Sequence, residues 1–188
     1  MNSHYYFKLY KPYGYISQFI TNDRHAKNKN FLGALYDFPE GTMAVGRLDE
    51  PSEGLLLLTT DGTFSYAISK GNVEKEYYVQ VDGIVTEAAL NTLKEGVPIS
   101  VNSKAYITKP CTVKKIETPT LPETKQRIRA DRHGPTSWLS ITITEGKFRQ
   151  VRKMTAAVGF PTLRLARVRV ENHTIENMNV GEVVVITA

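Results

Sequence analysis

The stretch AVGRLDEPSEGLLLLTTDG, which runs from Ala44 to Gly62, places charged side chains directly before a run of four leucines. A continuous apolar run bounded by glycines and an Asp-Gly turn signal predicts a strand that is buried on both faces. A charged side chain beside such a strand loses hydration and costs free energy unless a partner compensates. Arg47, Asp49 and Glu53 therefore need an explanation that strand and turn formation alone does not supply.

Asp49 is the charge best placed for chemistry, because it lies in a tight loop between two predicted buried strands. A partly desolvated carboxylate stays ionised only beside a cation or several N–H donors. Arg47, or an arginine from elsewhere, can supply that cation, and the carboxylate then suits a nucleophile or a base. The loop leaves a second interpretation open, in which Asp49 and Glu53 only cap turns and helix ends.

Tyr77, in the strand-like segment KEYYV, is a second candidate. An aromatic ring can stack on a base that has been extracted from its helix, and the hydroxyl can relay a proton. Tyr78 faces the opposite side of the strand, so at most one of the two belongs to a given site. A purely structural strand tyrosine is the alternative interpretation.

The distribution of charge indicates a polyanionic partner. The chain of 188 residues has a net charge of +5, which is by itself only mildly basic. Seven Lys or Arg residues and no acid occur from Lys147 to Arg169, and a second basic run covers 125–133. Nucleic acid fits such like-signed blocks, and a simply solvated surface is the alternative.

Several classes of protein are excluded by what the sequence lacks. A single cysteine, Cys111, permits no internal disulfide, fits a reducing cytoplasmic location, and is expected to be a strand residue rather than a nucleophile. No apolar run is long enough to cross a membrane. The four histidines have no ligand spacing, and no Gly-rich phosphate loop occurs, so neither a metal nor a cofactor is expected.

Periodicity predicts an α+β fold with a mixed, mainly antiparallel sheet. Thr118 to Ser137 has three prolines and little periodicity, which is typical of a long functional or mobile loop. Short helices are expected over 30–36, 63–69, 86–96 and 147–159, and strands over 5–10, 15–19, 42–46, 55–60, 75–83, 137–144, 162–170 and 182–187, with two more inside 104–117.

The predicted helix over 147–159 has two unlike faces. An apolar stripe of Phe148, Val151, Met154 and Val158 is expected to pack downward, and Gly159 and Pro161 end the helix. The opposite side carries positive charges at i, i+3 and i+4, and is expected to look outward or into a cleft. Its residues are Arg149, Arg152 and Lys153.

Four motifs in order resemble the pseudouridine synthases, in the branch that contains the A-type enzyme of the small ribosomal subunit and the B-, E- and F-type enzymes of the large one. GRLDEPSEGLLLLTTDG resembles the catalytic signature of that family, and KPYGYISQF resembles its opening motif. KEYYVQV resembles its K-x-Y motif, and EGKFRQVRKM its E-G-x-x-R-Q-V-R-R-M motif. The segments RIRADRHGPTSW, PTSWLSITITEG and RKMTAAVGFPTLRL, which lie within 127–165, look most like the E-type group.

The resemblance implies an isomerase that converts a uridine of 23S rRNA to pseudouridine without a cofactor. It implies Asp49 as the nucleophile, Tyr77 as the residue that stacks on the flipped base, and Arg152 as the partner of Asp49. It implies one catalytic domain, 1–188, of two lobes around a central RNA-binding cleft, with no S4 domain before the opening motif. The residues expected to bind RNA are Arg47, Arg149, Lys153, Arg164, Arg167 and Lys147.

Two other functions remain open from the sequence. The chain could be a non-catalytic rRNA-binding or ribosome assembly factor, although it retains Asp49, Tyr77 and Arg152. A glycosidase that uses Asp49 and Glu53 as its two carboxylates is the third hypothesis. In every case a monomer without an obligate protein partner is expected, and the modified uridine is not readable from the sequence.

Overall fold

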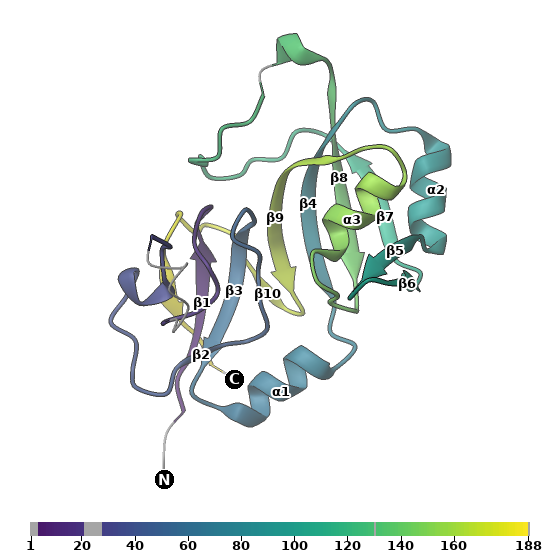
Figure 1. The fold of residues 1–188 in the computed structure, drawn as a ribbon. Coiled ribbons are helices and arrows are strands. Elements are labelled where there is room, and N and C mark those ends of the chain that lie inside the picture. The colour runs from purple at the N-terminus through teal and green to yellow at the C-terminus, as the bar shows by residue number, and fades with distance from the viewer. Residues whose placement is uncertain (1–3, 21–27, 130, 188) are drawn as a thin grey trace. The chain divides into compact units, whose positions relative to one another are not determined.

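The computed structural model describes residues 4–20, 28–129 and 131–187, which fall into two compact units (Figure 1). The chain passes between the units more than once, so neither unit is one continuous segment. The first unit consists of Met1–Val73, Pro122–Gln126 and Arg167–Ala188, and the second of Glu74–Leu121 and Arg127–Ala166.

The first unit is built on an antiparallel sheet in which β1 pairs with both β3 and β11, and β2 pairs with β3. Helix α1 packs against β3, which it follows directly in the chain. The elements are β1 (Tyr6–Lys11), the 3-10 turn η2 (Leu32–Ala34), β2 (Met43–Ala44), β3 (Glu53–Thr59), α1 (Gly62–Lys70), β10 (His173–Thr174) and β11 (Val183–Val185).

In the second unit, β8 pairs antiparallel with β4 on one side and with β7 on the other. Helix α2 packs against β7, and α3 packs against β5 of a separate two-stranded hairpin (Figure 1). The elements are β4 (Lys75–Asp82), α2 (Glu87–Glu95), β5 (Pro98–Val101), β6 (Lys104–Ile107), β7 (Thr112–Ile116), the 3-10 turn η3 (Asp131–His133), β8 (Thr136–Ile143) and α3 (Gln150–Ala157). Strand β9 (Thr162–Val170) begins in the second unit and ends in the first.

The leucine run forms β3, and every residue of that strand is buried, as the apolar pattern predicts. On one face Leu55 and Leu57 form a core with Val45 and Val170, against which α1 packs. Leu56 and Leu58 point to the other face, where they are fully buried as well. The strand that follows the Asp49 loop is therefore fixed from both sides.

The core of the second unit lies between β8, β4 and the two helices. Leu139, Ile141 and Ile143 of β8 are buried on one face, as their alternation predicts. On the opposite face Trp138 and Ser140 are buried while Thr142 is half-buried, and the buried Ser140 hydroxyl is satisfied by donating to Glu76 Oε1 at 2.7 Å.

The predicted α+β class with a mainly antiparallel sheet is confirmed, and most elements lie where the periodicity places them. Helix α2 has the expected caps, with Thr86 accepting from Ala89 N and Gly96 at the end. The strand predicted over 15–19 is wrong, since that segment makes only an isolated bridge at Tyr15. Strand β5 was not predicted, and the helix predicted over 30–36 is a single 3-10 turn.

Candidate active site

Asp49 lies half-buried in the loop between β2 and β3, and both of its neighbours are tied to the segment after β1. The Ser17 hydroxyl donates to Leu48 O at 2.7 Å and accepts from Leu48 N at 2.9 Å. On the other side, Gly14 N donates to Glu50 O at 2.9 Å. Because these bonds use main-chain atoms, they hold the loop without occupying the Asp49 carboxylate.

Lys11 is the unexpected charge beside Asp49, and sequence reasoning did not single it out. Lys11 is completely buried at the end of β1, and its Nζ donates to Pro12 O at 3.0 Å and to Tyr15 O at 2.6 Å. Burial lowers the pKa of Lys11 from its ordinary value to about 7, and the negative charge of Asp49 is the main influence that opposes this shift. Both bonds survive loss of the proton, since a neutral amine keeps two N–H donors.

The lowered pKa of Lys11 predicts that folding stability rises with pH just above neutrality. In the unfolded chain Lys11 has its ordinary pKa of 10.5, whereas in the folded chain its pKa is about 7. Between these two pH values the unfolded state therefore binds more protons than the folded state. Stability should therefore increase by up to about 1.4 kcal/mol per pH unit above pH 7 and flatten below it. Urea unfolding of the wild type and Lys11→Met from about pH 6 to about pH 8.5 measures this contribution as the difference between the two proteins. Parallel pH curves for the two proteins would rule it out.

The other charges around Asp49 differ in their surroundings. Glu53 is buried in β3 and accepts from the Tyr10 hydroxyl at 2.9 Å, which suits the structural role expected of it. Arg47 is exposed on the loop. The Arg167 side chain is buried and its Nε donates to Leu55 O at 2.7 Å, which braces β3, and its expected contact with RNA stays a prediction.

Tyr77 lies on β4, where it shares a buried face with Val79 and Val81. It stands opposite Ile141 in the register with β8. Tyr78 points to the other side, as the strand period requires. Of the two tyrosines, Tyr77 is thus the one on the buried face, and its role against a flipped base stays a prediction.

Helix α3 begins later than its sequence pattern predicts, and this leaves Lys147, Phe148 and Arg149 outside it. Gln150 is the first helical residue, and Arg149 precedes it in the left-handed conformation with φ of 53°. Arg149 is therefore not one turn from Arg152 on a helix face, and Phe148 is not part of the apolar stripe. Arg152 and Lys153 lie half-buried on the helix, Arg164 half-buried on β9, and Lys147 and Arg149 are exposed. The pairing of Arg152 with Asp49 stays a prediction.

Glu145 and Gln150 fix the segment between β8 and α3. Glu145 accepts from the Tyr106 hydroxyl of β6, from Lys109 N at 2.8 Å and from Gln150 Nε2 at 2.7 Å. These bonds outweigh the effect of burial and hold the pKa of Glu145 below its ordinary value. Gln150 also accepts from Lys147 N at 2.9 Å. The basic side chains of this segment consequently start from an anchored backbone.

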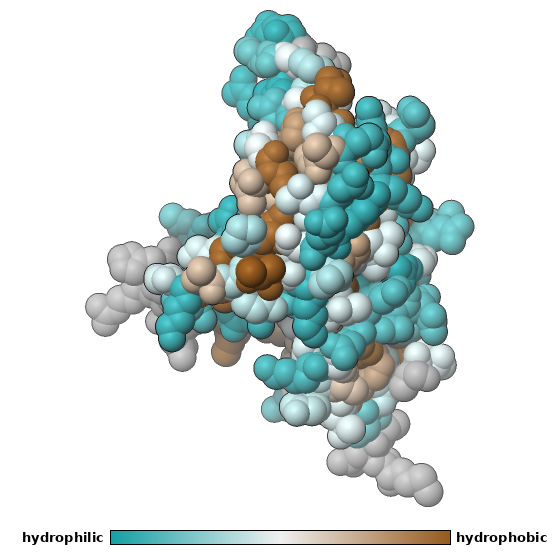
Figure 2. Space-filling view, turned by 90° about the vertical axis from the view of Figure 1, so that its right-hand side faces the viewer, coloured by the Kyte–Doolittle hydropathy of each residue, from teal (hydrophilic) through white to brown (hydrophobic). Residues whose placement is uncertain are grey.

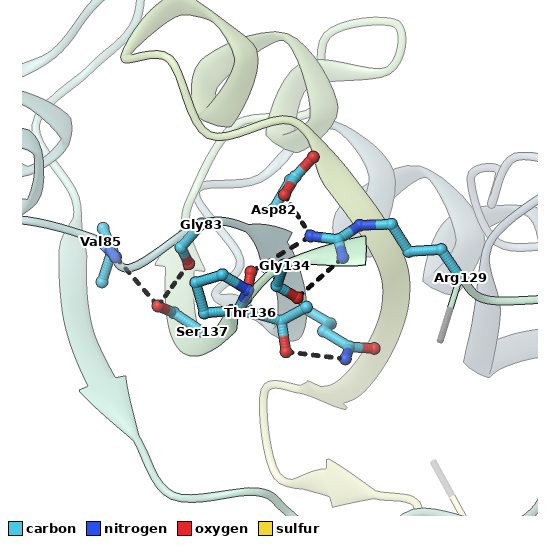
Figure 3. A network of polar contacts seen from close by, with 9 residues as sticks. Asp82, Gly83, Val85, Arg129, Gly134, Thr136 and Ser137 are labelled. Atoms are coloured by element: carbon cyan, nitrogen blue, oxygen red, sulfur yellow. Dashed lines mark hydrogen bonds and ion pairs between the residues drawn. The ribbon is translucent and has the colours of Figure 1, made fainter. Parts of the chain in front are cut away.

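The long loop predicted over 118–137 is confirmed, apart from the short turn η3 and the start of β8 at Thr136. One of its basic residues is structural. The Arg129 guanidinium pairs with Asp82 and donates to Gly134 O at 2.8 Å and Pro135 O at 3.1 Å, as Figure 3 shows. Nearby, Ser137 Oγ accepts from Val85 N at 2.9 Å. Arg129 thus closes the turn that leads into β8.

No group of three or more His, Cys, Asp or Glu side chains suited to a metal ion occurs among residues 4–20, 28–129 and 131–187. Cys111 donates to Leu93 O at 3.2 Å, and burial raises the pKa of its thiol to about 11, which disfavours a nucleophilic thiolate. In the same described part of the chain, none of the helices has the length and apolar character needed to span a membrane.

Comparison with known families identifies the chain. The model of the RNA pseudouridylate synthase family matches residues 5–157. The chain belongs to the RNA pseudouridylate synthase family. Among pseudouridine synthases, it is 40% identical over 174 residues to ribosomal large subunit pseudouridine synthase E of Vibrio vulnificus. The aligned region covers 92% of this chain and 70% of the relative. The enzyme of the same name from Xanthomonas campestris is 40% identical over 177 residues, or 93% of this chain and 91% of the relative.

The pseudouridine synthase fold predicted from the motifs is confirmed by a solved structure. A crystal structure of a pseudouridylate synthase superimposes with a TM-score of 0.78 and 26% sequence identity, over 100% of this chain and 72% of that chain.

Lys11 and Pro12 belong to the opening motif of the chain, so the buried lysine could have been found from one signal. That signal is the position of Lys11 directly after two apolar residues, Leu9 and Tyr10, because a lysine at the buried end of a strand loses its hydration.

Proposed function

We propose that this pseudouridine synthase converts a uridine of large-subunit rRNA to pseudouridine, with Asp49 as the nucleophile. The observation that supports it most directly is the Asp49 loop, whose main chain is anchored on both sides while its carboxylate lies half-buried next to the buried Lys11. The relatives named as large-subunit enzymes match more than nine-tenths of the chain at about 40% identity.

The chemistry of the reaction agrees with the residues proposed for it. The N–C glycosidic bond of the uridine breaks, a C–C glycosidic bond forms, and the proton that leaves the new attachment carbon returns to the base. The product has the same atoms as the substrate, so the isomerisation needs no redox cofactor. Asp49 attacks the uridine, Tyr77 stacks on the flipped base, and Arg152 keeps the carboxylate charged and oriented.

Exposed and half-buried basic side chains bind the rRNA, because contacts with phosphates supply most of the affinity for nucleic acid. We assign this role to Arg47, Lys147, Arg149, Lys153 and Arg164, and for the buried Arg167 it stays a prediction. The protein is proposed to act as a monomer in the cytoplasm, where its substrate is made, and without a metal.

The function is tested by incubating the purified protein separately with unmodified large-subunit and small-subunit rRNA and mapping pseudouridine by carbodiimide-stop sequencing. We expect one new pseudouridine in the large-subunit RNA and none in the small-subunit RNA. Salt-sensitive RNA binding with no pseudouridine in either RNA would instead support the non-catalytic assembly factor.

A further inference from the structure

Phe148 is a large apolar residue that the fold leaves at the surface. It is 69% exposed, in the segment between β8 and α3. The face of the molecule in Figure 2 is mainly hydrophilic, with hydrophobic residues in small separate groups. Single exposed apolar residues are common on protein surfaces, so the setting of this ring, and not its exposure alone, decides whether it suits a ligand.

One cation lies over this ring, and a second belongs to the residue directly before Phe148 in the sequence. Lys153 Nζ lies over the Phe148 ring at 5.3 Å from its centroid, and it also donates to Ser100 O at 2.6 Å. Lys147 Nζ lies 4.8 Å from the centroid of the Tyr106 ring. The cation over one face of Phe148 leaves the other face for a second planar group.

The positive charge of Lys147 helps to hold the pKa of Glu145, the nearest acid in sequence, below its ordinary value, so Glu145 offsets part of the local positive charge. Glu145 is held by its bonds to Tyr106, Lys109 and Gln150. The same bonds anchor the backbone on both sides of Phe148, since Gln150 accepts from Lys147 N. The ring is thus presented by a fixed segment in a basic setting.

We infer that Phe148 is a stacking platform for a nucleobase of single-stranded RNA, an inference that rests on the proposed function. Nucleobases stack on exposed aromatic rings, and the phosphates between them pair with lysines such as Lys147 and Lys153. An apolar protein partner would not explain why the exposed ring is flanked by cations. Lys147, Phe148 and Lys153 together form what we call the basic-aromatic surface.

The test measures binding of a fluorescein-labelled single-stranded oligouridylate of about ten nucleotides, a length within the site size of one single-strand-binding fold. Phe148→Ala and Phe148→Leu should each weaken binding about tenfold, because neither side chain can stack. The matched control is Tyr66→Ala, which removes an aromatic side chain of α1 that is 70% exposed, and this variant should bind as the wild type does.

Phe148→Trp supplies an independent readout. It should bind like the wild type, and its fluorescence should be quenched by the oligouridylate, while the single native tryptophan, Trp138, is buried and gives a constant background. Each of two results overturns the inference: unchanged affinity in Phe148→Ala, or an unquenched Phe148→Trp that still binds RNA.

The same proteins separate this inference from the proposed function. If the wild type forms pseudouridine in rRNA but Phe148→Ala binds oligouridylate equally well, only the stacking platform is wrong. If Phe148→Ala loses affinity and Phe148→Trp is quenched while the wild type forms no pseudouridine, the platform stands and the enzymatic function fails. Retained RNA affinity in Phe148→Ala together with loss of a protein from its complexes would assign the basic-aromatic surface to a protein partner instead.

Discussion

Asp49→Asn should abolish pseudouridine formation while leaving the protein folded and able to bind RNA. Removal of a nucleophile typically lowers kcat by about a thousandfold or more. The loop itself should persist, because Ser17 and Gly14 hold it through main-chain atoms of Leu48 and Glu50. Single-turnover assays on large-subunit rRNA measure the loss, and far-ultraviolet circular dichroism with RNA titration measures what is retained.

Glu50→Gln is the matched control for this prediction, since it removes the neighbouring acid of the same loop. Glu50 forms a partly exposed ion pair with Lys29, with 2.7 Å between Oε2 and Nζ, and such pairs contribute about 0–1 kcal/mol. The activity of Glu50→Gln should stay within about threefold of the wild type, because loss of this ion pair changes the free energy so little. An active Asp49→Asn, or equal loss of activity in both variants, would show that the assignment of the nucleophile is wrong.

Gly54→Ala should prevent stable folding. Gly54 stands opposite Lys11 in the β1–β3 register and has φ of +100°, a conformation that residues with a Cβ rarely adopt. A Cβ at this position would lie 2.3 Å from Arg167 O and 2.9 Å from Arg167 N, so the backbone itself would have to move. We expect a loss of about 4 kcal/mol or more, which nearly exhausts the stability of a domain at the lower end of the usual range of about 5–15 kcal/mol.

Gly62→Ala is the control for that substitution. Gly62 begins α1, and a Cβ there would meet nothing within 4 Å. Its urea unfolding midpoint should equal or slightly exceed that of the wild type, because alanine favours the helix and restricts the unfolded chain. A Gly54→Ala protein that unfolds at the wild-type urea concentration would refute the close packing of β3 on Arg167.

The elements that sequence patterns predicted well are those whose pattern and burial agree. The leucine run gives β3 because it is buried on both faces, and α2 has a capping threonine, an apolar stripe and a terminal glycine in the right order. Strand β5 is only four residues long, and its pairing with β6 depends on a tight turn at Asn102 and Ser103, both with positive φ. So short a strand gives little periodic signal.

The start of α3 could not be read from spacing, because a tertiary network decides it. Phe148 fits the apolar stripe in its spacing, but Glu145 and Gln150 hold the preceding segment outside the helix. Arg149 then takes a left-handed conformation and the ring turns to the surface. A hydrogen-bond network formed with β6 leaves no local trace in the sequence of the helix.

The candidate site was predictable to a different degree for each residue. Asp49 was found from its motif, and the structure adds the main-chain bonds that hold its loop. Arg167 was expected at the RNA surface because it belongs to a basic run, yet it lies in a part of β9 that is buried on both faces, and its Nε donates to Leu55 O. Lys11 was missed because burial, which changes its pKa, is a property of the packed strand and not of the charge count.

The central claim is that this protein isomerises a uridine of large-subunit rRNA through Asp49. The most direct measurement maps pseudouridine in the rRNA of cells that lack this gene and are complemented with wild type, Glu50→Gln or Asp49→Asn. The claim predicts that one pseudouridine of the large-subunit rRNA disappears on deletion and returns with wild type and Glu50→Gln, but not with Asp49→Asn. An unchanged pattern after deletion, or full restoration by Asp49→Asn, would contradict it.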